Sequence, residues 1–403
     1  MTTCLKIGNW NAPWLAMRFG TPLYVYDAEK IIANFRRIVS SIPYEPKQIH
    51  YAIMCNNHPK ILTLLLDVGS SLQVNSLQEY MLAQQCGYSK QQISVTTTNI
   101  SPRDMKRFIT LGAHLNLDSL EEVEEYGEIT SHYGDHPLIK KEIGIRVFIQ
   151  PGMLNQCATN KPYDPKARVG IKREKFPEAK RIAKKYGLKI TGIHGYLASN
   201  VLDLEPFLTL SSYLADCAKE FEDIEYINFG AGFGIPAKPT DKEFDWGGYG
   251  QRLTSLMHSV SKYFGREISL KIEPGRSLIG DAGTLLCEVT NVKNMDTWTQ
   301  IGVNCGFGIF ARPYIYGQNA GGWHDIVVAN KINSKPKRLY TICGNSVLQN
   351  DFLAEDRLLP KIMVGDILAI KNAGAYGSVL MSLFPGYKKP TEILVSEAGI
   401  KTF

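Results

Sequence analysis

The sequence predicts an α/β protein, a (β/α)8 or TIM barrel with an additional β-domain. Two observations lead to this prediction. From about residue 45 to 275, short apolar segments rich in Ile and Val alternate with helical segments, as expected for parallel strands covered on both faces. After residue 280 this alternation stops, and strand-like segments follow one another with turns between them.

Eight strands are expected in the first region, which is the number that closes such a barrel. A doubly wound open sheet is the alternative that the same alternation allows. The expected strands are 48–54, 72–74, 93–96, 115–117, 142–148, 189–195, 226–229 and 269–273.

The helices between these strands have recognisable ends. Ser76 with Glu79, and Ser119 with Glu122, each have the spacing of a capping box. Ser101 stands before a proline that suits the first turn of a helix. Glycines are expected where helices end, at Gly69, Gly87, Gly112 and Gly187.

The β-domain is expected to be a Greek-key-like barrel or a sandwich. Its predicted strands are 284–292, 325–328, 338–342 and 367–370, and the strand-like segment 22–26 could join the same sheet. The predicted division is therefore a barrel over 30–280 and a β-domain formed by 1–29 and 281–403.

Composition narrows the possible partners and location. The chain has 403 residues and a net charge of +6, with Lys and Arg spread along it, so no nucleic-acid partner is expected. No segment approaches the length of a membrane span, and no signal peptide is evident. The eight cysteines are scattered and show no metal-binding spacing, so we expect a cytoplasmic protein with free thiols and no metal.

Several motifs fall at the carboxyl ends of expected barrel strands, where active sites of such barrels lie. The first strand ends in Tyr51-Ala52-Ile53-Met54-Cys55-Asn56, and the eighth in Glu273-Pro274-Gly275-Arg276. Gly230-Ala231-Gly232-Phe233-Gly234 follows the seventh strand, and its backbone amides could hold a phosphate group.

These pieces, in this order, resemble the fold-type III pyridoxal-phosphate (PLP) decarboxylases, which include diaminopimelate and ornithine decarboxylase. The resemblance runs over nearly the whole chain, from the segment 20–27 through Arg312-Pro313-Tyr314-Ile315-Tyr316 to the segment 373–377. It implies a barrel of the alanine racemase/decarboxylase type. It also implies a head-to-tail homodimer with its active sites at the interface.

The resemblance also assigns roles to residues. Glu273 would face the pyridine nitrogen of the cofactor, and Arg312 and Tyr316 would bind a substrate carboxylate. The remaining expected contacts with the cofactor, its phosphate or the substrate are Tyr196, Ser199, Gly230, Gly232, Gly234, Arg276, Asp351 and Tyr376.

The residues that would perform the chemistry are replaced. Met54 stands where the family has the lysine that forms a Schiff base with PLP, and a thioether cannot form an imine. Tyr196 replaces a ring-stacking histidine, and Gln73 replaces an acid. The segment 344–351 places Val347 at the catalytic cysteine and Leu348 at a glutamate of the diaminopimelate enzymes.

Neighbouring side chains do not obviously compensate. Lys60 lies in the following helix and would have to reach back around the strand end. Cys55 is expected to pack on the opposite side of the strand, and Cys343 to be a buried strand thiol. His58 is polar and could line the mouth of the barrel.

The sequence therefore predicts a diverged relative that binds an amino-acid-like or phosphate-bearing anion. It would act as a pseudoenzyme, with an active paralogue as a possible partner, or as an enzyme with altered chemistry. PLP would bind non-covalently if at all. An inactive variant of a diaminopimelate- or ornithine-type decarboxylase is the alternative, and a purely structural role for the retained residues is another.

Overall fold

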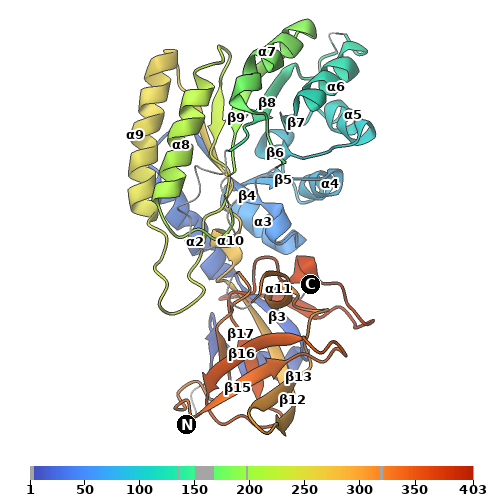
Figure 1. Cartoon of the computed structure of the whole chain (residues 1–403), viewed down its shortest axis with the longest axis vertical. Helices are drawn as coiled ribbons and strands as arrows, with labels where there is room; N and C mark the ends of the chain where they lie inside the picture. The colour runs from blue at the N-terminus through green and yellow to red at the C-terminus, as the bar shows by residue number, and fades with distance from the viewer. Residues whose placement is uncertain (1–3, 135, 150–167, 197, 318–320, 403) are drawn as a thin grey trace.

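The computed structural model describes residues 4–134, 136–149, 168–196, 198–317 and 321–402. Eight parallel strands close into a barrel in the order β10-β11-β4-β5-β6-β7-β8-β9, which confirms the predicted barrel and excludes the open sheet. The barrel occupies the upper part of Figure 1, and the β-domain lies below it. The strands are β4 (Lys47–Ala52), β5 (Ser71–Val74), β6 (Ile93–Thr96), β7 (His114–Leu117), β8 (Glu142–Arg146), β9 (Lys189–His194), β10 (Tyr226–Asn228) and β11 (Ser269–Ile272).

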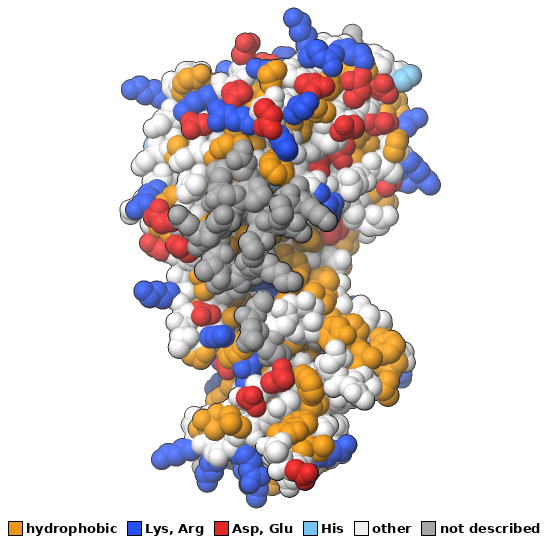
Figure 2. Space-filling model, viewed as in Figure 1, with side chains coloured by type: hydrophobic (Ala, Val, Ile, Leu, Met, Phe, Trp, Pro, Cys, Tyr) orange, Lys and Arg blue, Asp and Glu red, His pale blue; other side chains and the backbone are white. Residues whose placement is uncertain are grey.

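Helices cover the outside of the barrel because their apolar faces pack against strands that are buried on both sides. Basic and acidic side chains are interspersed over the face of the barrel seen in Figure 2. The covering helices are α2 (Ala28–Ser41), α3 (Pro59–Asp67), α4 (Leu77–Gln85), α5 (Pro102–Thr110), α6 (Leu120–Ser131), α7 (Phe176–Lys185), α8 (Glu205–Ala218) and α9 (Trp246–Phe264).

The predicted helix starts are found, with one difference. Ser76 and Ser119 accept hydrogen bonds from the backbone amides of Glu79 and Glu122, as a capping box requires. The two carboxylates, however, accept from the amides one residue before each cap, those of Asn75 and Asp118. The four glycines expected at helix ends all have positive φ, which explains why glycine stands there.

Most predicted strand ends extend too far. β4 ends at Ala52 rather than 54, and β8 ends at Arg146 rather than 148. The apolar residues at these ends continue past the last strand hydrogen bonds, because the chain already turns away from the sheet there to form a loop. After β4 it does so through a single 3-10 turn, Ile53–Cys55.

The second domain is a sheet with the strand order β16-β15-β13-β12-β3-β18-β19, to which β17 and β14 are joined beside β12. β3, from the N-terminal part of the chain, pairs antiparallel with β12 and parallel with β18, so the segment 22–26 does join this sheet. The strands are β3 (Leu23–Asp27), β12 (Gly283–Asn294), β13 (Thr299–Val303), β14 (Ile326–Val328), β15 (Arg338–Cys343), β16 (Phe352–Leu359), β17 (Ile367–Ile370), β18 (Thr391–Ser396) and β19 (Gly399–Thr402).

The remaining elements are short. A two-stranded ribbon and one helix lie near the N-terminus: β1 (Lys6–Ile7), β2 (Trp10–Asn11) and α1 (Ala12–Phe19). Two short helices follow the last barrel strand, α10 (Arg276–Ile279) and α11 (Arg312–Tyr316). Among the helices of the described residues, none is long and apolar enough to cross a membrane.

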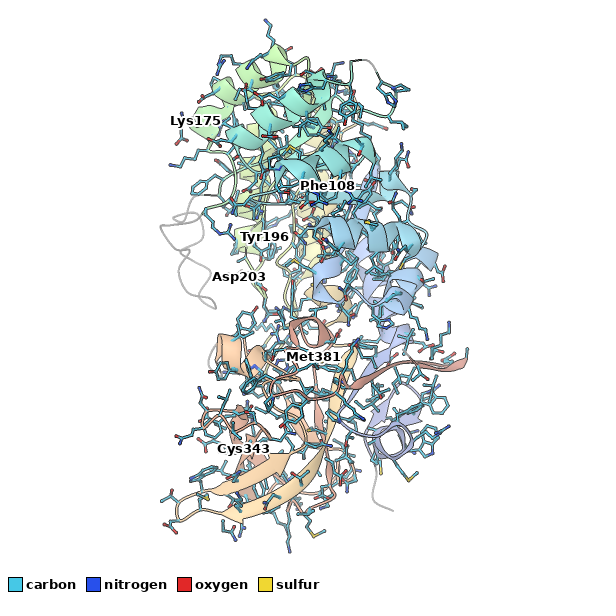
Figure 3. All side chains as sticks on the ribbon, turned by 90° about the vertical axis from the view of Figure 1, so that its right-hand side faces the viewer. Phe108, Lys175, Tyr196, Asp203, Cys343 and Met381 are labelled. Carbon is cyan, nitrogen blue, oxygen red and sulfur yellow. The ribbon has the colours of Figure 1, made fainter. Side chains whose placement is uncertain are left out.

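The carboxyl ends of the barrel strands face the β-domain. The backbone amide of Tyr376, in the β-domain, donates to the carbonyl of Cys55 just after β4, over 2.8 Å. In Figure 3, Tyr196 lies at the edge of the barrel toward the β-domain, whereas Cys343 lies well down in the β-domain. Cys343 is buried in β15, as predicted, and lies away from this junction.

Candidate functional site

Met54 lies in the turn after the first barrel strand, two residues beyond the strand end. This turn leaves 45% of the Met54 surface exposed, whereas the neighbouring Cys55 is buried. A thioether is soft and apolar and carries no amine. Met54 can therefore only pack against a ligand, whereas a lysine at this position could react with a carbonyl group.

Cys55 packs against the start of α10, as expected. A Cβ placed on Gly275 would lie 2.2 Å from the Cys55 Sγ, so only glycine leaves room for the thiol there. Burial raises the pKa of Cys55 to about 11, although the Tyr376 hydroxyl hydrogen-bonds to the thiol and two arginines lie nearby. A thiol that stays protonated is a poor nucleophile.

Lys60 and His58 also have other partners. The Lys60 ammonium donates to the carbonyl oxygen of Thr402, in the last strand of the β-domain. His58 caps α3, since its Nδ1 accepts from the Lys60 amide, and burial lowers the pKa of His58 to about 4. These contacts hold Lys60 at β19 and His58 at the start of α3.

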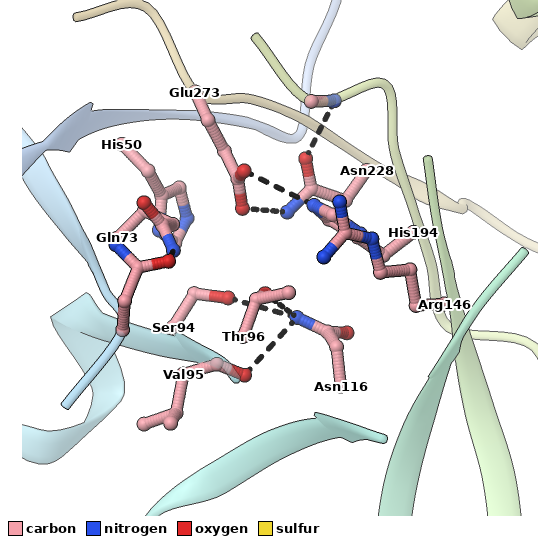
Figure 4. Close-up of polar contacts among 12 residues, drawn as sticks. His50, Gln73, Ser94, Val95, Thr96, Asn116, Arg146, His194, Asn228 and Glu273 are labelled. Carbon is pink, nitrogen blue, oxygen red and sulfur yellow. Dashed lines mark hydrogen bonds and ion pairs between the residues drawn. The ribbon is translucent and has the colours of Figure 1, made fainter. Parts of the chain in front are cut away.

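Glu273 is buried at the end of β11 in a network of three side chains (Figure 4). Its two oxygens accept from Asn228 Nδ2 at 2.7 Å and from His194 Nε2 at 3.1 Å. Burial raises the pKa of Glu273, but His194, His50 and Asn228 together outweigh burial and hold it below its usual value. The carboxylate is therefore negatively charged and fixed in place. The His194 Nδ1 is buried and has no hydrogen-bond partner among the described residues.

Arg146 enters the same network from β8, beside His194 in the neighbouring strand (Figure 4). Its guanidinium lies 3.6 Å from the Asp118 carboxylate and 6.0 Å from the centre of the Tyr196 ring. Asp118 also accepts from Thr98 Oγ1 at 2.6 Å, so its orientation is fixed. A cation is thus held beside the position that the sequence predicted for the face of a cofactor ring.

The glycine loop lies tightly against the segment after β9. A Cβ on Gly230 would lie 1.9 Å from the carbonyl oxygen of Gly195, and one on Gly232 would lie 2.4 Å from that of Ala198. Gly230 and Gly234 use their amides within the protein, donating to Asn228 and Val201. Within the described chain, the amides of Ala231 and Gly232 donate to no group, so these two remain for an anion.

Arg276 begins α10 and points toward Ser199 and Tyr376. Its Nη2 donates to the Ser199 hydroxyl at 3.2 Å, and its Cζ lies 5.0 Å from the centre of the Tyr376 ring. Its Nε is buried and has no hydrogen-bond partner among the described residues. Such an unpaired donor on a cation is unfavourable unless a ligand satisfies it.

Arg312 begins α11 and is 3% exposed. Its Nη2 donates to the Gly321 carbonyl at 2.6 Å and its Nε to His324 Nε2 at 3.1 Å, while Nη1 is buried without a described partner. Burial, and next the charge of Arg276, lowers the pKa of Arg312. Two arginines that repel each other, each with an unsatisfied nitrogen, lie at the junction of the two domains.

Tyr376 and Tyr316 border these arginines. Tyr376 has a φ of +58°, an uncommon conformation outside glycine, and burial raises its pKa well above the usual value. Tyr316 is exposed, with its ring centre 5.3 Å from the Arg312 Cζ. The structure therefore brings together Ser199, Arg276, Arg312, Tyr316 and Tyr376. Their contacts with a ligand stay a prediction.

The segment 344–351 is not joined to this group by any hydrogen bond or ion pair in the described chain. Val347 is 86% exposed. Asp351 accepts from the amides of Phe307 and Ser346 at 2.8 and 3.1 Å, so its carboxylate shapes this loop. A ligand contact for Asp351 stays a prediction. Gln73 also bonds locally, to Asn75 Oδ1 at 3.0 Å.

Four residues of the site were not predicted: Arg146, His194, Asn228 and His324. A charged residue at the carboxyl end of a barrel strand is a signal that could have found Arg146. His324 lies in no helix or strand, and no sequence motif connects it with Arg312. Their hydrogen bond becomes visible only in the folded structure.

A fixed carboxylate and a tight glycine loop at the strand ends, together with the two arginines at the domain junction, define the candidate site of a (β/α)8-barrel protein. The model of the pyridoxal-dependent decarboxylase family, pyridoxal binding domain, matches residues 28–280. The chain therefore belongs to the fold-type III PLP-dependent decarboxylase family.

Individual relatives agree with this assignment. The chain is 30% identical to the diaminopimelate decarboxylase of Methanothermobacter thermautotrophicus over 98% of this chain and 91% of that protein. It is 26% identical to protein TabA of Pseudomonas amygdali pv. tabaci, over 96% and 88% of the two chains. Among solved structures, AQ1208 of Aquifex aeolicus has 28% identity and a TM-score of 0.81, over 96% and 89%. Diaminopimelate decarboxylase of Helicobacter pylori, complexed with L-lysine, has 25% identity and a TM-score of 0.85, over 97% and 95%.

Proposed function

We propose that this protein binds a phosphate-bearing or amino-acid-like anion, with PLP as the first candidate, and that it does not carry out lysine-dependent decarboxylation. The observation that carries the proposal is the pair Arg276 and Arg312, each with a buried nitrogen that has no partner in the part of the chain that the structure describes. Met54, at the family's lysine position, cannot form an imine.

The chain's own residues fit PLP at two of its three attachment points. Arg276, Ser199 and the free amides of Ala231 and Gly232 would hold the phosphate. The charged Glu273 carboxylate would accept a hydrogen bond from a protonated ring nitrogen. Bound PLP supplies an electron sink. The third point would be a covalent bond to a lysine, and this chain has Met54 at that position.

Arg312 and Tyr316 support an amino-acid-like second ligand. The Arg312 guanidinium is held by His324 and Gly321 and leaves one nitrogen for a carboxylate. A relative solved with L-lysine is consistent with a ligand of this class. Binding without turnover would make the protein a pseudoenzyme. Turnover of another kind would require a proton donor or acceptor other than the replaced residues.

The proposal also includes the oligomeric state and the cellular location. Exposed Val347 and Tyr316 suit a homodimer in which a second copy completes the site, or pairing with an active paralogue. Analytical ultracentrifugation alone and after mixing with an active decarboxylase tests both. None of the seven described cysteines forms a disulfide, which supports a reducing, cytoplasmic location.

Titration of the purified full-length protein with PLP, followed by calorimetry, tests the proposal. Arg276→Gln should weaken binding by about 10- to 100-fold, because a hydrogen bond to a charged group contributes about 1.5–3 kcal/mol. Arg266→Gln, which alters an arginine that bonds to the carbonyls of Glu222 and Ile224, is the matched control and should leave the affinity unchanged. Equal affinities for wild type and Arg276→Gln would contradict the proposal.

A further inference from the structure

The barrel has a cavity at the amino ends of its strands, which we call the amino-end chamber. Its volume is about 280 Å³, and most of its lining residues begin barrel strands or come just before them. The site described above lies at the opposite, carboxyl ends of the same strands. The residues that matter for the argument are His50, Lys90, His114, Lys140, Tyr226 and Lys271.

Three lysines line the amino-end chamber. Lys90 precedes β6, Lys140 precedes β8 and Lys271 lies in β11. Across the described ranges, none of their ammonium groups forms an ion pair or donates a hydrogen bond. Burial, and next the charge of Lys90, lowers the pKa of Lys140. Burial and the charge of Lys140 lower the pKa of Lys271, against the opposite effect of the Glu273 and Glu225 carboxylates. Three lysines around one cavity, without an ion pair in the described chain, favour an anion as its ligand.

Lys271 is held in a defined position. Its Nζ lies 3.8 Å from the centre of the Tyr226 ring, a short cation–π contact. The Tyr226 hydroxyl donates to Asn116 Oδ1 at 2.5 Å and accepts from His114 Nε2 at 2.9 Å. A Cβ on Gly192 would lie 1.8 Å from this ring, so glycine makes room for it. Burial lowers the pKa of Lys271 to about 8.

The other titratable groups leave the chamber positive. Burial lowers the pKa of His50 to about 4 and that of His114 to about 3, so both rings are neutral near pH 7. Glu142 and Glu225 also line the chamber and partly offset the lysines. Neither carboxylate forms an ion pair with a described residue, so the lysine charges stay available to a ligand.

We propose that the amino-end chamber binds a small tetrahedral oxyanion, either inorganic phosphate or the phosphate group of a small ester, between Lys271, Lys140 and Lys90. Ammonium groups bind phosphate as point charges and need no planar geometry. The chamber is smaller than the usual 300–1,000 Å³ or so of ligand pockets, but it has room for one phosphate and several waters of about 30 Å³ each. This site is independent of the proposed function at the other end of the barrel.

Amine labelling of the full-length protein, read by peptide mass spectrometry, tests this proposal. We expect Lys271 to react, because a lysine with a pKa of about 8 is partly uncharged near neutral pH. Inorganic phosphate at about ten times its dissociation constant should slow labelling of Lys271 about tenfold, because about one site in ten stays free. Exposed Lys106 on α5 is the internal control and should be labelled at an unchanged rate.

Two variants locate the effect. Arg276→Gln alters only the carboxyl-end site, so phosphate should still protect Lys271 in this variant. In Lys140→Gln, phosphate should protect Lys271 less well. Comparison of inorganic phosphate with glycerol phosphate distinguishes a free ion from an ester, since the better ligand protects at lower concentration. Labelling of Lys271 that phosphate does not slow beyond an equal ionic strength of chloride would overturn the proposal. Protection that disappears in Arg276→Gln would overturn it as well.

Discussion

Arg312 and His324 form a fixed pair at the junction of the two domains. The Arg312 Nε donates to His324 Nε2 at 3.1 Å, and His324 Nδ1 donates to the carbonyl of Lys371 at 2.9 Å. The histidine can accept from arginine only as the neutral tautomer protonated at Nδ1. Burial, and next the charge of Arg312, lowers the His324 pKa and favours this neutral form. His324 therefore acts as a positioning residue for Arg312.

His324→Ala should weaken binding of an anionic ligand although His324 makes no proposed ligand contact. The expected loss is about 5- to 30-fold, or about 1–2 kcal/mol, because His324 acts through Arg312 and only part of the about 1.5–3 kcal/mol of a hydrogen bond to a charged group is lost from binding. Calorimetric titration with PLP and with L-lysine measures it. His132→Ala, on the exposed end of α6, is the matched control. An unchanged affinity for both ligands would show that His324 does not position the guanidinium.

Met54→Lys should restore a covalent link to PLP without restoring decarboxylation. The position is 45% exposed, so a lysine can extend from the turn without steric conflict. Tyr196, Val347 and Leu348 still replace the residues that the family uses for the later steps. Borohydride reduction with peptide mass spectrometry detects the link, and release of CO2 from diaminopimelate and ornithine measures activity.

Substantial CO2 release by Met54→Lys would mean that the chain is a decarboxylase inactivated at one position. The divergence of the site would then be confined to Met54.

Gly230→Ala should destabilise the protein more than Gly265→Ala. Both glycines have similar φ values, +66° and +64°, so both substitutions carry the cost of a left-handed backbone, about 1 kcal/mol. Only at Gly230 would the new Cβ meet another atom, the Gly195 carbonyl oxygen, whereas nothing lies within 4 Å at Gly265. We expect a loss of about 3 kcal/mol or more for Gly230→Ala in urea unfolding. Equal losses would refute the tight packing of the glycine loop.

His114 should make the protein sensitive to acid. Its folded-state pKa of about 3 lies below its usual 6.5, with Lys271, Lys140 and His50 adding to the effect of burial. The unfolded chain therefore binds a proton that the folded chain does not, and stability falls as pH drops from about 6.5 toward 3. Near pH 4.5, this one group should have lowered the free energy of unfolding by about 2–3 kcal/mol relative to pH 7.

His114→Gln tests this contribution, because glutamine can still donate to the Tyr226 hydroxyl but does not titrate. Urea unfolding between about pH 7 and 4.5 should show a shallower loss of stability for the variant. Curves that stay parallel to wild type over this range would contradict the assigned protonation.

The barrel could be predicted from sequence because its strands are short, contain Ile, Val and Leu, and alternate with clearly capped helices. Four strands of the β-domain, β13, β16, β18 and β19, were not predicted. The reason is visible in β16, where exposed Glu355 and Asp356 interrupt the buried positions and hide the strand pattern. Parallel strands also set the site: the register that places Arg146 beside His194 is a property of the closed barrel.

Site residues that belong to a motif could be located from the sequence, whereas the residues that orient them through hydrogen bonds could not. Arg276 and Arg312 stand in recognisable segments, but Asn228 and His324 become visible only through the side chains they orient. The lysines of the amino-end chamber share no motif at all. They meet because the barrel brings the starts of distant strands to one end.

Native mass spectrometry with PLP, with and without borohydride, tests the central claim most directly. The account predicts a complex of one PLP per chain that survives gentle ionisation, is weakened by Arg276→Gln and disappears on denaturation even after borohydride. A borohydride-stable adduct on a lysine at the carboxyl end of the barrel, or no complex at any concentration near that of the protein, would contradict it.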